Sequence, residues 1–90
     1  MRIDTPQSLG RAVRTIRKQL GLTQPELAMT AGTSVRFIVE VEKGKPTCQI
    51  GKVLTVLATL GMTLDLRPPP GITDEPTADP SKGLSDAADA

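Results

Sequence analysis

Aromatic residues and histidine are almost absent from this 90-residue chain. It has one Phe and no Trp, Tyr or His. Its core must therefore be built from Leu, Ile, Val, Ala and Met, which is typical of compact helical domains and argues against a β-sandwich or barrel. The length allows one small domain.

The shortage of reactive side chains excludes most kinds of active site. Cys48 is the only cysteine, so the chain has neither an internal disulfide nor the residues for a structural zinc site or a Cys–His or Ser–His dyad. The carboxylates do not cluster in a pattern that indicates a catalytic pocket. We expect no enzymatic activity, no cofactor and no metal site, and we interpret Cys48 as a small structural or surface residue.

Long apolar runs are missing as well. No window approaches the roughly 20 apolar residues that a membrane-spanning helix needs. The first residues lack the apolar segment of a signal peptide. We therefore expect a cytoplasmic protein that does not bind membranes.

Charge is divided between two parts of the chain. Residues 1–67 contain ten Lys and Arg against five Asp and Glu, which favours a polyanionic partner. Residues 68–90 contain one Lys against five acidic residues, begin with three prolines and have hardly any large apolar side chain. Such a composition cannot bury enough surface to offset the entropy of ordering. The sequence predicts a folded domain over residues 1–67 and a disordered, Pro-rich, acidic tail over residues 68–90.

Apolar periodicity and capping residues predict helices over residues 6–20, 24–31, 35–43 and 49–60. Thr5 or Asp4 can cap the first, Thr23 and Glu26 form a capping box for the second, and Ser34 can cap the third. The side chains expected to face inward are Leu9, Val13, Ile16, Leu20, Leu27, Ala28, Ala31, Ile38, Val41, Ile50, Val53, Leu54, Leu57 and Ala58.

Residues 62–67 alternate apolar and polar side chains, which predicts a short β-strand. No second strand is predicted to pair with it, and a single strand is not stable alone. One solution is a two-stranded ribbon with the same segment of a second copy, in which Met62, Leu64 and Leu66 cover the terminal helices. The other is an extended tail that packs on its own domain.

The two short helices and the glycine turn between them form a unit that can present its second helix to the major groove. The patterns Leu22-Thr-Gln-Pro-Glu-Leu-Ala28, Ala31-Gly-Thr-Ser34, Ile38 and Glu42-Lys-Gly44 resemble the lambda/434 repressor-like (XRE-type) helix-turn-helix family over residues 7–60. The resemblance implies an all-α domain of four to five helices, followed by one short dimerising β-strand and a disordered tail. It also implies a transcriptional repressor that binds double-stranded DNA sequence-specifically.

The resemblance assigns roles to particular positions. Arg36 can donate two hydrogen bonds to a guanine, or it neutralises a phosphate. Glu40 repels phosphates unless it accepts from a cytosine N4 or pairs with a nearby Lys. Arg17 and Glu42 match a structural ion pair between the first helix and the recognition helix. The positions expected to read bases are Ser34, Val35, Arg36, Val39 and Glu40, and those expected to contact phosphates are Thr23, Gln24, Lys43 and Lys45.

Two further segments, Pro6-Gln-Ser-Leu-Gly-Arg-Ala-Val-Arg14 and Leu60-Gly-Met-Thr-Leu-Asp-Leu66, resemble HipB-like antitoxins. These are repressors encoded beside HipA-like kinase toxins. The resemblance implies a homodimer on a palindromic operator, with half-sites about one helical turn (~10 bp) or a multiple apart. It also implies binding to a HipA-like Ser/Thr kinase toxin. The alternatives are a stand-alone XRE-type regulator and a protein-interaction adaptor that has lost DNA binding.

Overall fold

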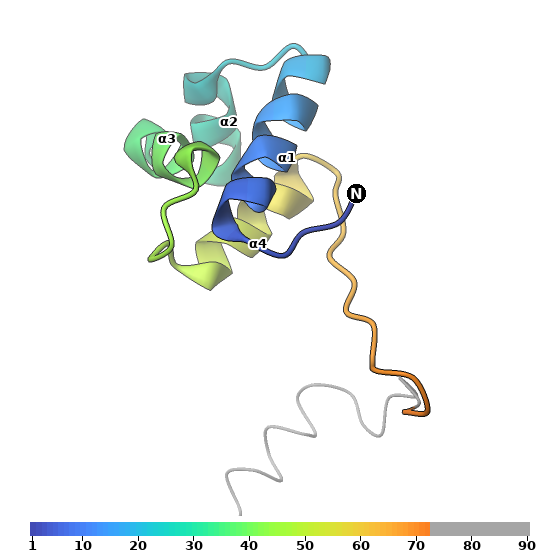
Figure 1. Cartoon of the computed structure of the whole chain (residues 1–90). Helices are drawn as coiled ribbons and strands as arrows, with labels where there is room; N and C mark the ends of the chain where they lie inside the picture. The colour runs from blue at the N-terminus through green and yellow to red at the C-terminus, as the bar shows by residue number, and fades with distance from the viewer. Residues whose placement is uncertain (73–90) are drawn as a thin grey trace, which may run out of the picture.

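The computed structural model describes residues 1–72, which form an all-α domain of four helices (Figure 1). The helices are α1 (Pro6–Gln19), α2 (Gln24–Ala31), α3 (Val35–Lys43) and α4 (Ile50–Thr59). The bounds predicted for α2 and α3 are confirmed. The helix predicted for α1 was one residue too long at its C-terminal end, because Leu20 is the C-cap. The one predicted for α4 was one residue too long at each end, because Gln49 is the N-cap and Leu60 the C-cap. The part of the predicted tail after residue 72 lies outside the described residues.

Hydroxyl side chains fix the first residue of each of the first three helices. The Ser8 amide donates to Thr5 Oγ1 at 3.0 Å, the Glu26 amide to Thr23 Oγ1 at 3.2 Å, and the Phe37 amide to Ser34 Oγ at 3.1 Å. Each bond satisfies an amide that has no partner within its own helix. The helix starts are therefore determined by local sequence.

The core lies where all four helices meet. Val13, Leu27, Ile38 and Val56, one from each helix, are completely buried. Cys48 is half-buried and packs against this core. Among residues 1–72, no helix has both the length and the apolarity required to cross a bilayer.

The inward face of α4 differs from the prediction. Ile50 and Leu54 are 66 % and 45 % exposed, and Ala58 is exposed too, whereas Val56 is completely buried. The helix has two apolar stripes at helical spacing, and the one that ends in Leu57 and Leu60 packs on the core. Leu20, predicted to be buried, is also exposed because it follows the last turn of α1.

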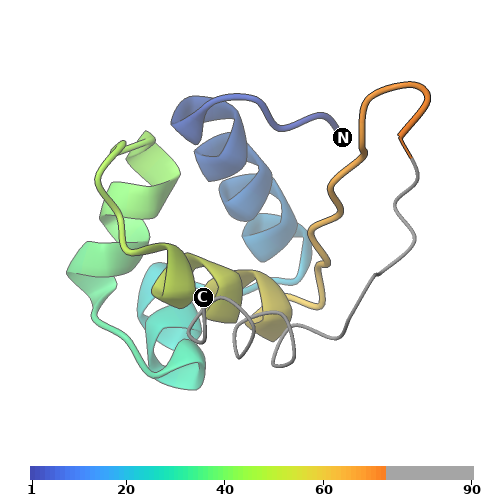
Figure 2. The same ribbon diagram turned by 90° about the horizontal axis from the view of Figure 1, so that it is seen from below.

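Residues 62–72 leave the helices on the side of the molecule where the N terminus lies, as both Figure 1 and Figure 2 show. Met62 packs against the core, but Leu64 and Leu66 are 48 % and 87 % exposed. Of the three apolar side chains in residues 62–67, only Met62 therefore packs against the core of its own domain. Within residues 1–72 no strand forms in the single chain, so the predicted pairing with a second copy remains a prediction.

Gly10 allows α1 to approach the end of α3 closely. A Cβ atom at this buried position would overlap Val41 O and would lie 2.7 Å from Glu42 O, both of which are backbone atoms. Backbone cannot move aside as a flexible side chain can. The crossing of α1 and α3 therefore requires glycine here.

We expect Gly10→Ala to lower the free energy of unfolding by about 1–3 kcal/mol, because overpacking forces the two helices apart. Urea titration followed by circular dichroism measures it. Gly51→Ala is the control, since a Cβ atom on this helical glycine meets nothing within 4 Å. It should leave stability unchanged or raise it by up to about 1 kcal/mol. Equal effects of the two substitutions would contradict the close approach.

Candidate nucleic-acid interface

Helix α3 has one anchored face and one free face. Ile38 and Val41 are buried against the core, whereas Arg36 and Ser34 are exposed and Val35 is 41 % exposed. In Figures 1 and 2, α3 lies on the side of the molecule away from the N terminus and residues 62–72. Of the predicted base-reading positions, Ser34, Val35 and Arg36 therefore lie on an accessible edge of the domain, whereas Val39 and Glu40 are half-buried.

An ion pair fastens α3 to α1. Arg17 donates from Nε to Glu42 Oε2 at 2.6 Å and from Nη2 to Glu42 Oε1 at 3.0 Å. The two side chains are 8 % and 4 % exposed. The hydrogen bonds that Arg17 donates to the Glu42 carboxylate raise the pKa of Arg17, so the guanidinium stays charged. This geometry is the bidentate one that gives Arg–carboxylate pairs directional strength.

Two further groups complete the hydrogen bonding of this pair. Arg17 Nη1 donates to the Leu22 carbonyl at 2.8 Å, which lies in the turn between α1 and α2. Gln24 Nε2 donates to Glu42 Oε1 at 3.1 Å. Among the described residues, no buried side-chain nitrogen or oxygen lacks a partner. One cluster therefore joins α1, α2 and α3, and the sequence had indicated only its Arg17–Glu42 pair.

Glu40 has cationic partners on the free side of α3. Lys45 Nζ lies 3.0 Å and Arg36 Nε 3.6 Å from Glu40 Oε2. The hydrogen bond from Lys45 lowers the pKa of the Glu40 carboxyl, so it is ionised at neutral pH. Of the options open from the sequence, pairing with a nearby Lys is therefore realised. The pair reduces the repulsion that an isolated carboxylate would exert on DNA phosphates.

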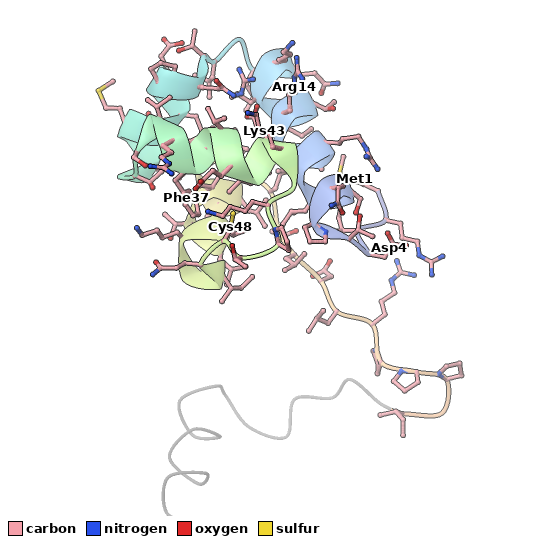
Figure 3. The ribbon with its side chains drawn as sticks, turned by 60° about the vertical axis from the view of Figure 1, so that its left-hand side comes forward. Met1, Asp4, Arg14, Phe37, Lys43 and Cys48 are labelled. Atoms are coloured by element: carbon pink, nitrogen blue, oxygen red, sulfur yellow. The ribbon has the colours of Figure 1, made fainter. Side chains whose placement is uncertain are left out.

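Thr23 and Gln24, both predicted to contact phosphates, also hold the fold together. The Thr23 hydroxyl oxygen accepts from Glu26, and the Gln24 amide donates to Glu42. Lys43 and Lys45 are exposed at the end of α3 and in the loop after it, with Lys43 labelled in Figure 3. These lysines therefore have room to meet a DNA backbone.

Lys52 lies in the first turn of α4. Its Nζ lies 5.7 Å from the centroid of the Phe37 ring, and Phe37 extends from α3 toward α4 (Figure 3). A cation over an aromatic face is attracted by the ring quadrupole. No pattern in the sequence signals this contact, because the residues belong to different helices and meet only in the folded chain.

Comparison with known proteins agrees with this arrangement. A family model described as a helix-turn-helix domain matches residues 8–69. The chain is an XRE-type helix-turn-helix protein of the HipB-like branch. An HTH-type transcriptional regulator of Sinorhizobium fredii (strain NBRC 101917 / NGR234), y4mF, is 56% identical over 68 residues, which cover 76% of this chain and 90% of the relative.

A second HTH-type transcriptional regulator, from Haemophilus influenzae, is 39% identical over 60% of this chain and 55% of its own length. Among solved structures, HipB in complex with an O2 20mer superposes with a TM-score of 0.70. It shares 26% identity and covers 77% of this chain and 96% of its own. A HipA–HipB–O2–O3 complex gives the same TM-score and identity, with 97% of its own chain covered. This helix-turn-helix protein is therefore a transcriptional regulator.

We expect Arg17→Met or Glu42→Leu alone to lower the free energy of unfolding by about 3–5 kcal/mol, because each leaves a buried charge without its partner. The double substitution should cost less than either single one, since neither charge is then left behind. Urea titrations of all four proteins give the comparison. Single variants that lose less than about 1 kcal/mol would show that water reaches the pair.

Proposed function

We propose that this regulator is a homodimeric repressor that binds a palindromic double-stranded DNA operator through α3 and serves as a HipB-like antitoxin. The observation that carries the proposal is the position of α3. Its inner face is fixed by the buried Arg17–Glu42 pair, and its outer face presents Val35 and Arg36 to solvent. A helix held rigidly at an edge fits the major groove, which is wide enough for one helix.

Charge around α3 supports DNA as the ligand. Arg36, Lys43, Lys45 and Lys52 are all exposed on α3, on the loop after it or on the start of α4. Arg36 is near the N-terminal end of the helix, with a side chain 87% exposed, so its guanidinium has room to extend to a guanine edge. Lysines near the end of α3 suit the phosphate backbone, which supplies most of the sequence-independent affinity. An adaptor that binds protein alone would not need this concentration of positive charge.

The segment of residues 62–67 supports a dimer. It lies on the side of the molecule away from α3 and exposes Leu64 and Leu66. Pairing two such segments about a two-fold axis would bury these leucines and leave both α3 helices on the outer sides. Symmetric dimers of this kind read two half-sites related by the same symmetry.

The antitoxin role rests on the HipB-like branch. The structural relatives include HipB in a complex with HipA. If the chain acts in the same way, it binds a HipA-like Ser/Thr kinase and represses the operon that encodes both proteins in the cytoplasm. A stand-alone regulator is the alternative. Co-purification with the product of an adjacent kinase-like gene would support the antitoxin role, and the lack of such a gene would favour the alternative.

The test of DNA reading compares Arg36→Ala with Lys43→Ala. The affinity of both variants for the DNA upstream of the gene is measured by fluorescence anisotropy. Scrambled DNA serves as the comparison, and the titrations are made at two salt concentrations. Arg36→Ala should weaken specific binding by about 1–3 kcal/mol and relax the preference at one base position. Lys43→Ala should weaken both DNAs alike and reduce the salt dependence. No binding by the unaltered protein at low salt would refute DNA recognition and favour the adaptor.

The test of the dimer compares Leu64→Lys with Thr63→Lys. Both add the same charge to the same exposed segment, but alternation along a strand places the two side chains on opposite faces. Leu64→Lys should shift the protein to monomer in sedimentation velocity, because the lysine cannot be buried in the apolar layer. Thr63→Lys should leave the dimer intact. If both variants stay dimeric, the ribbon is not the interface.

A further inference from the structure

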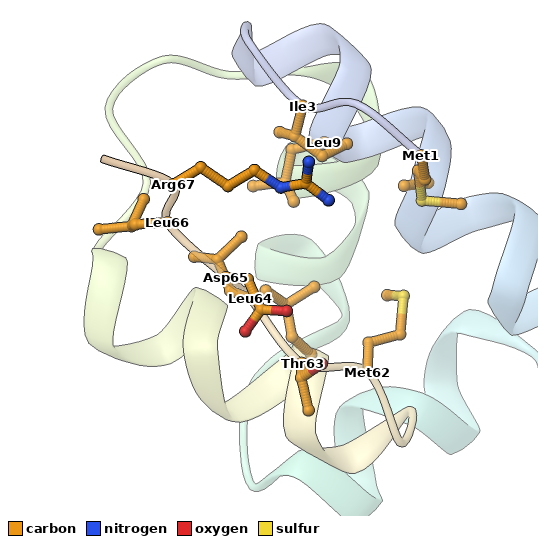
Figure 4. Close-up of a pocket in the computed structure, with 11 residues that line it drawn as sticks. Met1, Ile3, Leu9, Met62, Thr63, Leu64, Asp65, Leu66 and Arg67 are labelled. Atoms are coloured by element: carbon orange, nitrogen blue, oxygen red, sulfur yellow. The ribbon is translucent and has the colours of Figure 1, made fainter. Parts of the chain in front are cut away.

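Residues 1–4 and 65–67 face each other across an unfilled groove. The groove measures about 650 Å³ and is lined by Met1, Arg2, Ile3 and Asp4 on one side and Asp65, Leu66 and Arg67 on the other. A second cavity of about 300 Å³ joins the same segments to Leu9, Ala12 and Leu57 (Figure 4). Two segments far apart in sequence therefore frame one opening.

Both segments have unused main-chain groups. Among the described residues, neither Met1–Ile3 nor Thr63–Arg67 takes part in a backbone hydrogen bond, and neither segment belongs to a helix. Both also alternate apolar and polar side chains: Met-Arg-Ile-Asp in the first and Leu-Asp-Leu-Arg in the second. Alternation with free N–H and C=O groups is what an unpaired strand edge presents.

We propose that residues 62–67 of a second copy lie in this groove, between residues 1–4 and residues 62–67 of the first. Residues 1–4 then act as a clasp that holds the partner's strand on its outer edge. This inference rests on the proposed homodimer and adds to it. By symmetry, each chain clasps the other, so the two-stranded ribbon gains a further segment at each edge and its outer main-chain groups find partners.

The direction of the segments suits this arrangement. In Figure 4, Met1 lies toward Met62 and Ile3 toward Arg67, so residues 1–4 and 62–67 of one chain run the same way. A strand related by a two-fold axis runs antiparallel to its copy, and it is therefore antiparallel to residues 1–4 too. In antiparallel pairs, residues directly opposite each other share a face.

One register of residues 1–4 against the partner's strand places apolar side chains opposite apolar ones and opposite charges next to each other. When Arg2 lies opposite the partner's Asp65, Ile3 meets the partner's Leu64 and Met1 meets the partner's Leu66. Apolar side chains then pair with apolar ones above the cavity that reaches Leu9 and Leu57. Met1 and Leu66, which are 84 % and 87 % exposed in the single chain, become covered. The second copy is the occupant that supplies this complementary sequence.

The experiment uses full-length chains that carry Arg2→Glu or Asp65→Lys. Each variant alone places like charges opposite each other at both clasps of its dimer. An equal mixture forms a mixed dimer in which both clasps again join opposite charges, but only if the contact is between chains. A contact within one chain would stay repulsive in every dimer. Dimer dissociation is measured by energy transfer between labelled chains.

We expect each variant to dissociate about tenfold more readily than the unaltered protein, because two exposed charge contacts change sign. The mixed dimer should return to within about threefold of the unaltered protein. Arg14→Glu, which changes an exposed residue of α1 by the same charge, should leave the dissociation constant within about twofold. A mixed dimer no tighter than the two variants, or variants no weaker than the control, would overturn the clasp.

Failure of the clasp can be told from failure of the proposed dimer. If the unaltered protein dimerises and Leu64→Lys dissociates it, while the mixed dimer is no tighter than the dimers of the two charge variants, the ribbon stands and the clasp alone is wrong. If the unaltered protein is a monomer at every concentration, the proposed dimer itself is wrong and the clasp falls with it.

Discussion

The rest of the structure depends on the buried ion pair between Arg17 and Glu42. Two opposite charges with almost no solvent contact are tolerable only when each finds its partners at short range. Here the carboxylate accepts from Arg17 and Gln24, and the guanidinium also donates to the Leu22 carbonyl. These bonds determine how α1, α2 and the turn between them meet α3. The orientation of the helix proposed to read DNA is thus set by a contact on its opposite side.

The surfaces proposed for DNA binding and for dimerisation lie on different sides of the molecule. Helix α3 and the lysines that follow it lie on one side, and residues 62–67 with the N-terminal segment lie on the other. A symmetric dimer made through the second side leaves the first free for a duplex. The single acidic residue on the free side of α3, Glu40, is paired with Lys45 and Arg36. The acidic charge is therefore compensated where a polyanion is expected to approach.

Apolar exposure is unequal over the surface. Ile50 and Leu54 form an outward stripe on α4, and Leu64 and Leu66 project from the extended segment. A domain as small as this one buries a modest fraction of the surface that its unfolded chain exposes. A dimer that covers the segment of residues 62–67 would add buried area to this small domain. Such a dimer would cover the leucines that the folded single chain leaves exposed.

The sequence by itself determined the four helices, the starts of the first three and the ends of α2 and α3. Hydroxyl caps at Thr5, Thr23 and Ser34 and positive-φ glycines at Gly32 and Gly44 act over three or four residues, so local pattern suffices to predict them. It also indicated the Arg17–Glu42 pair, through resemblance to a family. Only the tertiary structure decided which of the two apolar stripes of α4 faces the core, that Gln24 donates to Glu42, and that Lys52 lies over Phe37. Those outcomes depend on how separate helices pack, and packing is a property of the whole chain that no local pattern contains.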